Sequence, residues 1–119
     1  MVHYLTTARN TDRALAAIAD PTRRAIVDRL ARGPARISDV AAAFPMTLTG
    51  FCKHVRILER AGLVRRKRRG RENTLRLQPE PLRDVAEWVF QYREFWTTRL
   101  DHLEQFFANR RAGTKSKGE

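Results

Sequence analysis

The chain has 119 residues, of which 24 are Lys or Arg and 13 are Asp or Glu, giving a formal net charge of +11. Hydrophobic residues make up 42 %, which suits one domain with one modest core. No apolar run approaches the roughly 18–20 residues that span a bilayer, and residues 1–10 lack the pattern of a signal peptide. The single cysteine excludes an intramolecular disulfide and favours the cytoplasm. Such a charge indicates a polyanionic partner, either nucleic acid or an acidic membrane surface.

The excess positive charge is concentrated in one part of the chain. Residues 51–78 contain 10 basic and 2 acidic residues, whereas residues 79–109 contain 3 basic and 6 acidic residues. The basic patch is therefore local rather than spread over the whole molecule. A local patch favours a specific electrostatic contact with a polyanion over general stickiness.

Apolar residues recur at helical spacing through most of the chain and alternate over one short stretch. We expect residues 1–10 to form an N-terminal arm and residues 110–119 a mobile basic tail. The domain between them, residues 11–109, is predicted to be mainly α with a small β-hairpin. In chain order, the predicted elements are helices 11–19, 22–32, 39–44 and 47–61, strands 63–69 and 73–77, and a long helix 79–109.

Local signals mark the ends of these elements. Asp20 can accept a backbone N–H as the N-cap of the second helix, with Pro21 at the first helical position. Gly33-Pro34 ends that helix, and Ser38 caps the small helix that follows. Two short helices around a tight turn, followed by a basic hairpin, predict a winged helix-turn-helix fold. Separately, we expect this fold to dimerise through its terminal helices, because the last helix is rich in aromatic residues.

The predicted helix 47–61 has two different faces. At 100° per residue, Phe51, Val55 and Leu58 fall within about 60° of one another and form the predicted core stripe. A solvated helix face usually mixes both signs of charge, so a face with cations and no anion predicts contact with a polyanion. The face opposite the stripe is of this kind, since it is made of Thr49, Cys52, Lys53, Arg56 and Arg60.

We expect this helix to enter the DNA major groove, which admits one helix whose exposed N-terminal residues meet base edges. Leu48 either contacts a thymine methyl or packs on the preceding helix, and we favour packing. His54 lies beside the core stripe, where a half-buried, hydrogen-bonded histidine is a better interpretation than a metal ligand. The predicted set of DNA-contacting residues on the helix is Thr47, Leu48, Thr49, Cys52, Lys53, His54 and Arg56.

The hairpin, residues 63–77, forms the wing, and six of the seven residues 65–71 are basic. These cations cannot form a core, and they would repel one another without an anionic partner. A hairpin tip can lie along phosphates or place an arginine in a narrow minor groove. Glu72 either orients a neighbouring arginine or helps to end the turn. The predicted DNA contacts of the wing are Arg65, Lys67, Arg68, Arg69 and Arg71.

Three segments carry a resemblance to a known family: AIADPTRRAIVDRLARGP, ISDVAAAFPMTLTGFCKHVRILERAGLVRRKRRGREN and LRLQPEPLRDVAEWVFQYREFWTTRLDHLEQF, about residues 12–107. They resemble the ArsR family of bacterial winged-helix repressors, and more narrowly its metal-independent, autorepressor-like branch. The resemblance implies a homodimer that binds a palindromic operator and represses transcription. The first turn of the predicted major-groove helix departs from the usual pattern, with Leu48-Thr49-Gly50, and Cys52 stands where the family often has serine.

Metal sensors of that family carry a cysteine pair in the small helix or Asp and His sets on the last helix. Here the small helix has no cysteine, and His102 on the last helix does not converge with Asp101 and Glu104. We therefore expect no metal and no other cofactor. We also expect no enzymatic activity, because we find no nucleophile–base pair, paired-carboxylate cleft or phosphate loop.

The predicted last helix carries seven of the ten aromatic residues. A helix of about 28 residues is roughly 42 Å long, and the short helices of a small domain cannot cover it. It either forms intramolecular core with a few exposed rings or pairs with a partner helix, and we favour pairing, which would place two major-groove helices about 34–36 Å apart. The predicted interface residues are Leu15, Trp88, Tyr92, Phe95, Trp96, Leu103 and Phe106.

Two functions of different classes fit these features. The first is a homodimeric, sequence-specific repressor that binds double-stranded DNA, with no membrane contact. The second is a basic adaptor that uses the winged helix to bind a protein or a membrane. The first function predicts binding that survives competitor DNA and weakens as salt rises.

Overall fold

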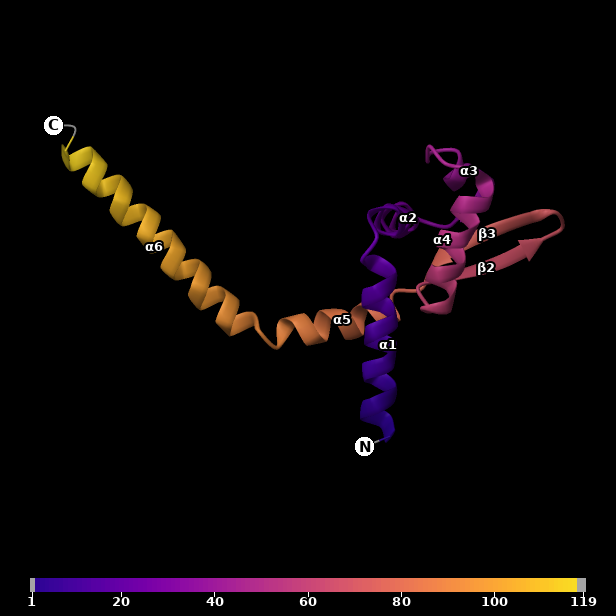
Figure 1. Ribbon diagram of the computed structural model, residues 1–119, viewed down its shortest axis with the longest axis horizontal. Helices are drawn as coiled ribbons and strands as arrows, with labels where there is room; N and C mark the ends of the chain where they lie inside the picture. Colours follow the sequence, from indigo (N-terminus) through magenta and orange to yellow (C-terminus); the bar gives the residue numbers. More distant parts are fainter. Residues whose placement is uncertain (1, 118–119) are drawn as a thin grey trace. The chain divides into compact units, whose positions relative to one another are not determined.

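The computed structural model describes the backbone of residues 2–117 and the side chains of residues 10–112. Its internal contacts divide the chain into a first unit, residues 1–86, and a second unit, residues 87–119. The first unit contains four helices and three strands, together with the start of a fifth helix, α5 (Figure 1). Their bounds are α1 Val2–Ile18, α2 Pro21–Ala31, β1 Ala35–Arg36, α3 Ile37–Ala41, α4 Leu48–Arg60, β2 Val64–Arg69, β3 Glu72–Leu77 and α5 Glu80–Phe90.

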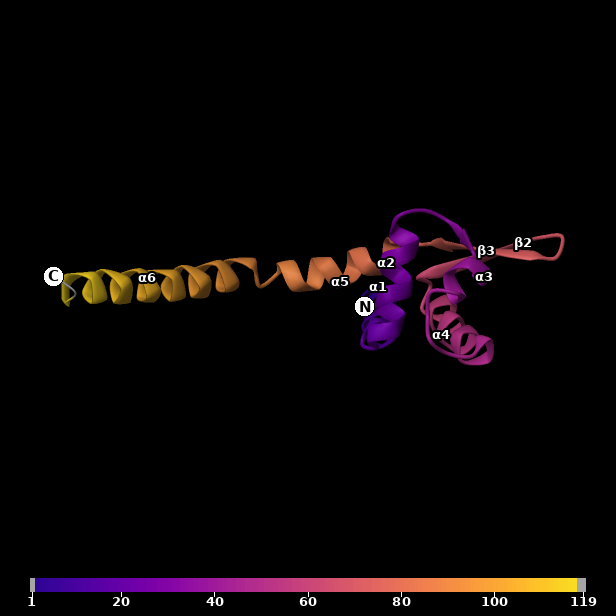
Figure 2. The ribbon, with the colours of Figure 1, turned by 90° about the horizontal axis from the view of Figure 1, so that it is seen from above.

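The three strands form an antiparallel sheet in the order β1-β3-β2. Strands β2 and β3 pair from Val64 opposite Leu77 to Arg69 opposite Glu72, which leaves a two-residue turn. Gly70 begins that turn with φ 60°, in the left-handed region that favours glycine. The predicted hairpin is therefore confirmed, and it projects beyond α3 and α4 as the wing (Figures 1 and 2).

The core of the first unit lies where α1, α2 and α4 meet the base of the sheet. Phe51, Val55 and Leu58 of α4 are fully buried, as the predicted stripe requires. Burying side chains of this size stabilises the fold by about 1.5–3 kcal/mol each. The other buried residues are Ala14, Ala17, Ile26, Val27, Leu30, Val40, Leu63, Val64 and Leu75.

Two boundaries in the N-terminal half differ from the sequence-based expectation. Helix α1 begins at Val2 rather than at residue 11, so residues 2–10 continue the first helix instead of forming an arm. Helix α3 begins at Ile37, with Arg36 rather than Ser38 at its N-cap position. Strand pairing explains the second difference, because Arg36 ends β1 opposite Thr74 and the helix starts directly after it.

The predicted helix 79–109 is wrong as a single element. The structure has α5, Glu80–Phe90, and α6, Arg93–Lys117, separated by a turn at residues 91–92. At this turn the backbone N–H of Tyr92 donates to the carbonyl of Val89, three residues back, which tightens the end of α5. Because α6 continues to Lys117, the expected tail is helical over residues 110–117, and residues 118–119 lie outside the described residues.

Candidate nucleic-acid interface

Helix α4 starts at a well-formed cap. The side chain of Thr47 accepts a hydrogen bond from the backbone N–H of Gly50, with 3.1 Å between Oγ1 and N. This cap satisfies one of the free N–H groups of the first helical turn. The remaining free N–H groups give the start of α4 a partial positive charge, which favours an anion there.

The exposed face of α4 is positively charged, as predicted. Lys53, Arg56 and Arg60 are exposed, and Thr49 stands beside them near the start of the helix. Cys52, on the same face, is half-buried. The one acidic residue of α4, Glu59, accepts a hydrogen bond from Arg66 of β2, with 2.9 Å between Nη2 and Oε1.

The exposure of the Leu48 side chain contradicts one sequence-based expectation. We favoured packing of this side chain on the preceding helix, but 61 % of Leu48 is exposed. It is the first residue of α4, directly after the Thr47 cap, so its side chain stands at the exposed start of the helix. An exposed leucine at this place is available to a thymine methyl, the other alternative given for it.

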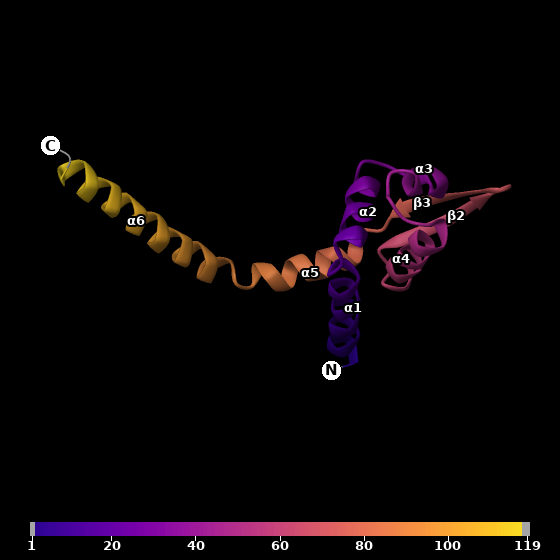
Figure 3. The same ribbon diagram turned by 45° about the horizontal axis from the view of Figure 1, so that its top comes forward.

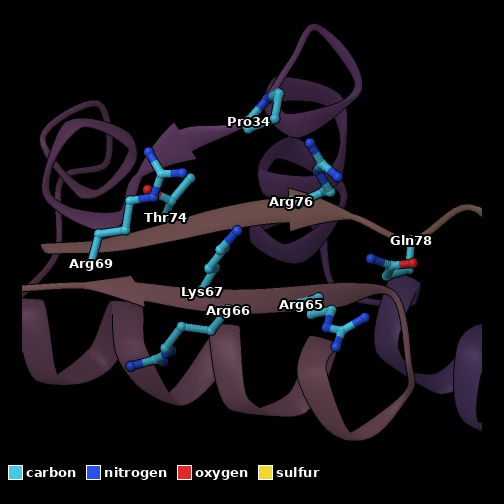
Figure 4. Close-up of a pocket in the computed structure, with 8 residues that line it drawn as sticks. All are labelled: Pro34, Arg65, Arg66, Lys67, Arg69, Thr74, Arg76 and Gln78. Atoms are coloured by element: carbon cyan, nitrogen blue, oxygen red, sulfur yellow. The ribbon is translucent and has the colours of Figure 1, made fainter.

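The wing carries its cations on both faces. The register places Arg65, Lys67 and Arg69 of β2 on one face, because successive residues of a strand alternate between faces. Arg66 belongs to the other face and turns to α4, where it holds Glu59. Figure 4 shows the hollow beside these strands, which is lined by Pro34, Arg65, Arg66, Lys67, Arg69, Thr74, Arg76 and Gln78; among them, the side chain of Arg66 points the other way, toward α4.

Sequence reasoning missed Arg76 as a candidate contact. It lies directly opposite Arg65 in the β2–β3 pair, and like charges at opposite positions destabilise a sheet. An anion between these two side chains would remove that repulsion. The alternation of β3 could have revealed this residue, because Arg76 stands between Leu75 and Leu77, whose burial marks the other face.

The tip of the wing is held by its own polar groups. Arg68 Nε donates to the carbonyl of Gly70, the first residue of the turn, at 3.1 Å. Glu72 was expected either to orient a neighbouring arginine or to help end the turn. It does bind an arginine, but this is Arg36, which is 36 positions away in the sequence. Arg36 donates to Asp39 and Glu72 at 3.0 Å each, and these hydrogen bonds raise its pKa. Lys67, Arg69 and Arg71 remain exposed.

His54 is half-buried and hydrogen-bonded, which confirms the interpretation of the sequence. Its Nδ1 lies 3.3 Å from Nη1 of Arg23 and 3.9 Å from Oδ2 of Asp20. Asp20 caps α2, since its carboxylate accepts the backbone N–H of Arg23 at 3.0 Å. That hydrogen bond is the main cause of the lowered pKa of Asp20, and the positive charge of Arg23 adds to it.

The predicted interface residues fall in both units. Leu15 of α1 is half-buried in the first unit. In the second unit, 46–57 % of each predicted aromatic side chain and of Leu103 is exposed in the single chain. Leu100 and Phe107, exposed to 60 % and 49 %, were not among the predicted residues. The signal that could have found them is their spacing of three or four residues from Trp96 and Leu103 on the same helix.

Two properties bear on metals and membranes. Within the part of the chain that the structure describes, no group of three His, Cys, Asp or Glu side chains is close enough to hold a metal ion. Among the described helices, none combines the length and the apolar character needed to cross a membrane.

Comparison with known sequences supports this geometry. Residues 18–67, from the end of α1 to the middle of β2, match the model of a helix-turn-helix domain family. The chain is 36 % identical over 101 residues to the HTH-type transcriptional regulator Rv2034 of Mycobacterium tuberculosis, covering 85 % of this chain and 92 % of that protein. It is 32 % identical over 76 residues to the transcriptional repressor SdpR of Bacillus subtilis, covering 64 % of this chain and 84 % of the repressor.

Solved structures agree with the sequence matches. The crystal structure of the ArsR family transcriptional regulator RHA00566 has a TM-score of 0.70 and 39 % identity, over 76 % of this chain and 93 % of that one. A solution structure of the homodimeric winged helix-turn-helix DNA-binding domain Mb0332 of Mycobacterium bovis has a TM-score of 0.56 and 27 % identity, over 85 % and 88 % of the two chains. The chain therefore belongs to the ArsR family of winged helix-turn-helix transcriptional regulators.

Proposed function

We propose that the protein is a homodimeric repressor that binds a palindromic DNA operator in the cytoplasm, with α4 in the major groove and the wing on the backbone or in the minor groove. The observation that carries this proposal is the positive charge of the exposed face of α4, which no acidic side chain of the helix offsets. Arg66 of the wing holds Glu59, the acidic residue of α4, so the cations of the exposed face have no acidic competitor on the helix.

The N-terminal half of α4 is suited to base recognition. Thr49 and Lys53 are exposed near the helix start, where a major-groove helix meets base edges. A threonine hydroxyl can bond a base edge, and a lysine can bond the acceptors of guanine. Leu48 adds an apolar contact for a thymine methyl. These residues would choose the sequence, whereas Arg56 and Arg60 would hold phosphates.

The wing would supply affinity rather than sequence choice. Its exposed cations stand along an extended strand, where alternate side chains follow one another at about 6.7 Å. Phosphates along a nucleic-acid strand follow at a similar interval, so Arg65, Lys67 and Arg69 can each meet one. Each such contact releases counterions, which makes binding weaken as salt rises.

Helix α6 supports the homodimer. Trp96, Leu100, Leu103 and Phe107 are spaced four, three and four residues apart, so they form one stripe within about 60° of arc. Between 49 % and 60 % of each side chain is exposed in the single chain. A helix with such an uncovered stripe pairs with a second helix, and a second copy of this chain offers the identical stripe. The domain Mb0332, similar over 85 % of this chain, is described as homodimeric, which supports a homodimer here.

Repression follows from occupancy. A dimer seated on an operator that overlaps a promoter would deny that DNA to RNA polymerase. The similarity to SdpR, named a transcriptional repressor, supports repression rather than activation. No bond is made or broken in this mechanism, so the proposal contains no enzymatic step.

Selection of duplexes from a random DNA library by the purified protein tests the proposal. We expect an enriched palindrome that the protein binds in excess competitor DNA, with log K falling linearly against log salt concentration. Binding of all duplexes with equal affinity, or binding of anionic vesicles in preference to the enriched DNA, would contradict the proposal. The vesicle arm tests the basic adaptor directly.

A further inference from the structure

Arg23 joins three helices of the first unit. Its Nε donates to the carbonyl of Ala17 at 2.6 Å, and its Nη2 donates to that of Ala16 at 3.3 Å, both in the last turn and a half of α1. Its Nη1 lies 3.3 Å from Nδ1 of His54 in α4. Arg23 itself belongs to α2, whose N-cap Asp20 holds its backbone N–H. One guanidinium therefore connects the end of α1 with the middle of α4.

The chemistry of the pair fixes the direction of the third contact. A guanidinium has only donors, so Nδ1 of His54 must accept the hydrogen bond and the ring hydrogen must be on Nε2. The planar, rigid guanidinium presents its donors in several fixed directions at once, which the single ammonium of lysine cannot do. The contact is thus specific to arginine at position 23 and to an acceptor at position 54.

The position of His54 gives this contact a consequence for DNA binding. His54 follows Lys53 directly and lies one turn beyond Gly50, within the half of α4 suited to base recognition. Because α1 and α4 also pack together, a rigid contact between the end of α1 and the middle of α4 limits how α4 can tilt against α1. If α1 joins the dimer interface, that tilt sets how far apart the two copies of α4 stand.

We infer that Arg23 is a positioning residue for operator recognition: through His54 it holds α4 at a fixed angle to α1, and so fixes the half-site spacing that the dimer accepts. Arg23 itself does not touch DNA in this inference. The inference rests on the proposed function, because it needs a dimer that reads two half-sites. It also assigns His54 a role inside the protein in place of a direct contact with a base.

Arg24 provides a matched control. Its Nη1 donates to the carbonyls of Ile18 at 2.9 Å and Ala19 at 3.1 Å, so it also satisfies carbonyls at the end of α1. Among the hydrogen bonds of the described residues, those of the Arg24 side chain go only to this end of α1. Arg24→Ala therefore removes one positive charge and hydrogen bonds to carbonyls at the end of α1, as Arg23→Ala does. The contact between Arg23 and His54 of α4 remains.

The first experiment compares Arg23→Ala with Arg24→Ala on three duplexes: the operator selected by the wild-type protein, the same operator with one base pair added between its half-sites, and an unrelated duplex. We expect Arg23→Ala to weaken binding of the native operator by about tenfold. Arg23→Ala should weaken binding of the other two duplexes by less. The ratio of its affinities for the native operator and for the lengthened operator should therefore be smaller than that of the wild-type protein. Arg24→Ala should weaken binding of all three duplexes by the same factor. That factor should be smaller than the loss of affinity for the native operator in Arg23→Ala.

The second experiment keeps the inference testable if Arg23→Ala unfolds the protein. In His54→Asn, the amide Oδ1 can accept from Arg23 at nearly the same place, whereas His54→Leu has no acceptor. We expect His54→Asn to retain the preference for native spacing and His54→Leu to lose it, at equal helix content by circular dichroism. The double variant Arg23→Ala/His54→Leu should bind no more weakly than the weaker single variant, because both remove the same contact.

Equal losses for Arg23→Ala and Arg24→Ala, or a preference for native spacing that is the same in His54→Asn and His54→Leu, would overturn the inference. Failure of the wild-type protein to select any palindrome is a different result, because it contradicts the proposed function itself.

Discussion

Helices α4 and α6 both carry an apolar stripe, but only one stripe is covered within the chain. The stripe of α4 is fully buried against α1, α2 and the sheet, so this helix has a fixed place in the first unit. The stripe of α6 is about half exposed. Apolar exposure on this scale marks an association surface. The difference separates two tasks, since α4 is built for precise presentation of polar groups and α6 for contact with another helix.

The largest expected effect comes from breaking the stripe of α6. Trp96→Asp places a charge on the apolar stripe of the proposed helix pair, so the protein should sediment as a monomer. A monomer reads one half-site, and its affinity for the operator should fall on the order of 10²–10⁴-fold because the second half-site no longer adds to binding. Gln105→Asp is the control, because position 105 lies about 180° from Trp96 on the same helix.

An intact dimer for Trp96→Asp in sedimentation equilibrium would contradict the role of α6. Equal dissociation of Trp96→Asp and Gln105→Asp would show that added negative charge, rather than the stripe, controls assembly.

The next effect comes from the wing. Replacing Arg69 and Arg71 by Ala removes two exposed cations and leaves the hydrogen bond of Arg68 to the turn in place. We expect weaker binding to every duplex and a salt slope smaller by about 0.9 for each phosphate that the wing no longer neutralises. The pair Arg93→Ala/Arg111→Ala changes the net charge equally in α6, and it should leave the slope nearly unchanged.

A smaller and more selective effect belongs to the start of α4. Lys53→Ala should reduce discrimination at one operator position, by about 1–3 kcal/mol if the lysine contacts a base. Competition between operators that differ at single positions measures this change. A uniform loss on all of them would instead assign Lys53 to the phosphate backbone, as we expect for Arg56→Ala.

The smallest effect concerns Asp20, which supports the position of α4 from α2. Its pKa is lower in the folded protein, chiefly through the hydrogen bond from the Arg23 N–H, so its charged form favours folding. This stability is present above the ordinary pKa of an aspartate and is lost as pH falls through the lowered value. We expect Asp20→Ala to lower Tm by a few degrees at pH 7 and to match the wild type more closely in acid.

Thermal melts of Asp20→Ala and the wild-type protein at several pH values check this sign. A Tm difference that grows as the solution becomes more acidic would show that the carboxylate is not stabilised by its contacts.

Local patterns predicted the first unit well. The buried stripe of α4 and the paired wing follow from spacing and turn residues. Figure 3 shows the hairpin of β2 and β3 beside α4. The break at residues 91–92 was missed because the turn contains neither glycine nor proline, and an apolar pattern runs through it. The pairing of β1 with β3 was missed because two residues are too few to show alternation.

The candidate site was predictable to the same degree. Its cations are local in sequence, so charge counting found most of them. Arg76 depends on the register of the hairpin, and the contact of Arg23 with His54 joins residues 31 positions apart. Arg76 alternates with Leu75 and Leu77, but its position opposite Arg65 follows only from the register. The contact of Arg23 with His54 leaves no periodic signal in the sequence, because it arises from tertiary packing.

Hydroxyl-radical footprinting of the selected operator tests the central claim most directly. A homodimer with α4 of each copy in the major groove should protect two symmetric segments, centred about 10–10.5 base pairs apart on one side of the duplex. The protein should bind with two chains per duplex. Protection of a single segment by one chain, or of no defined segment, would contradict the account.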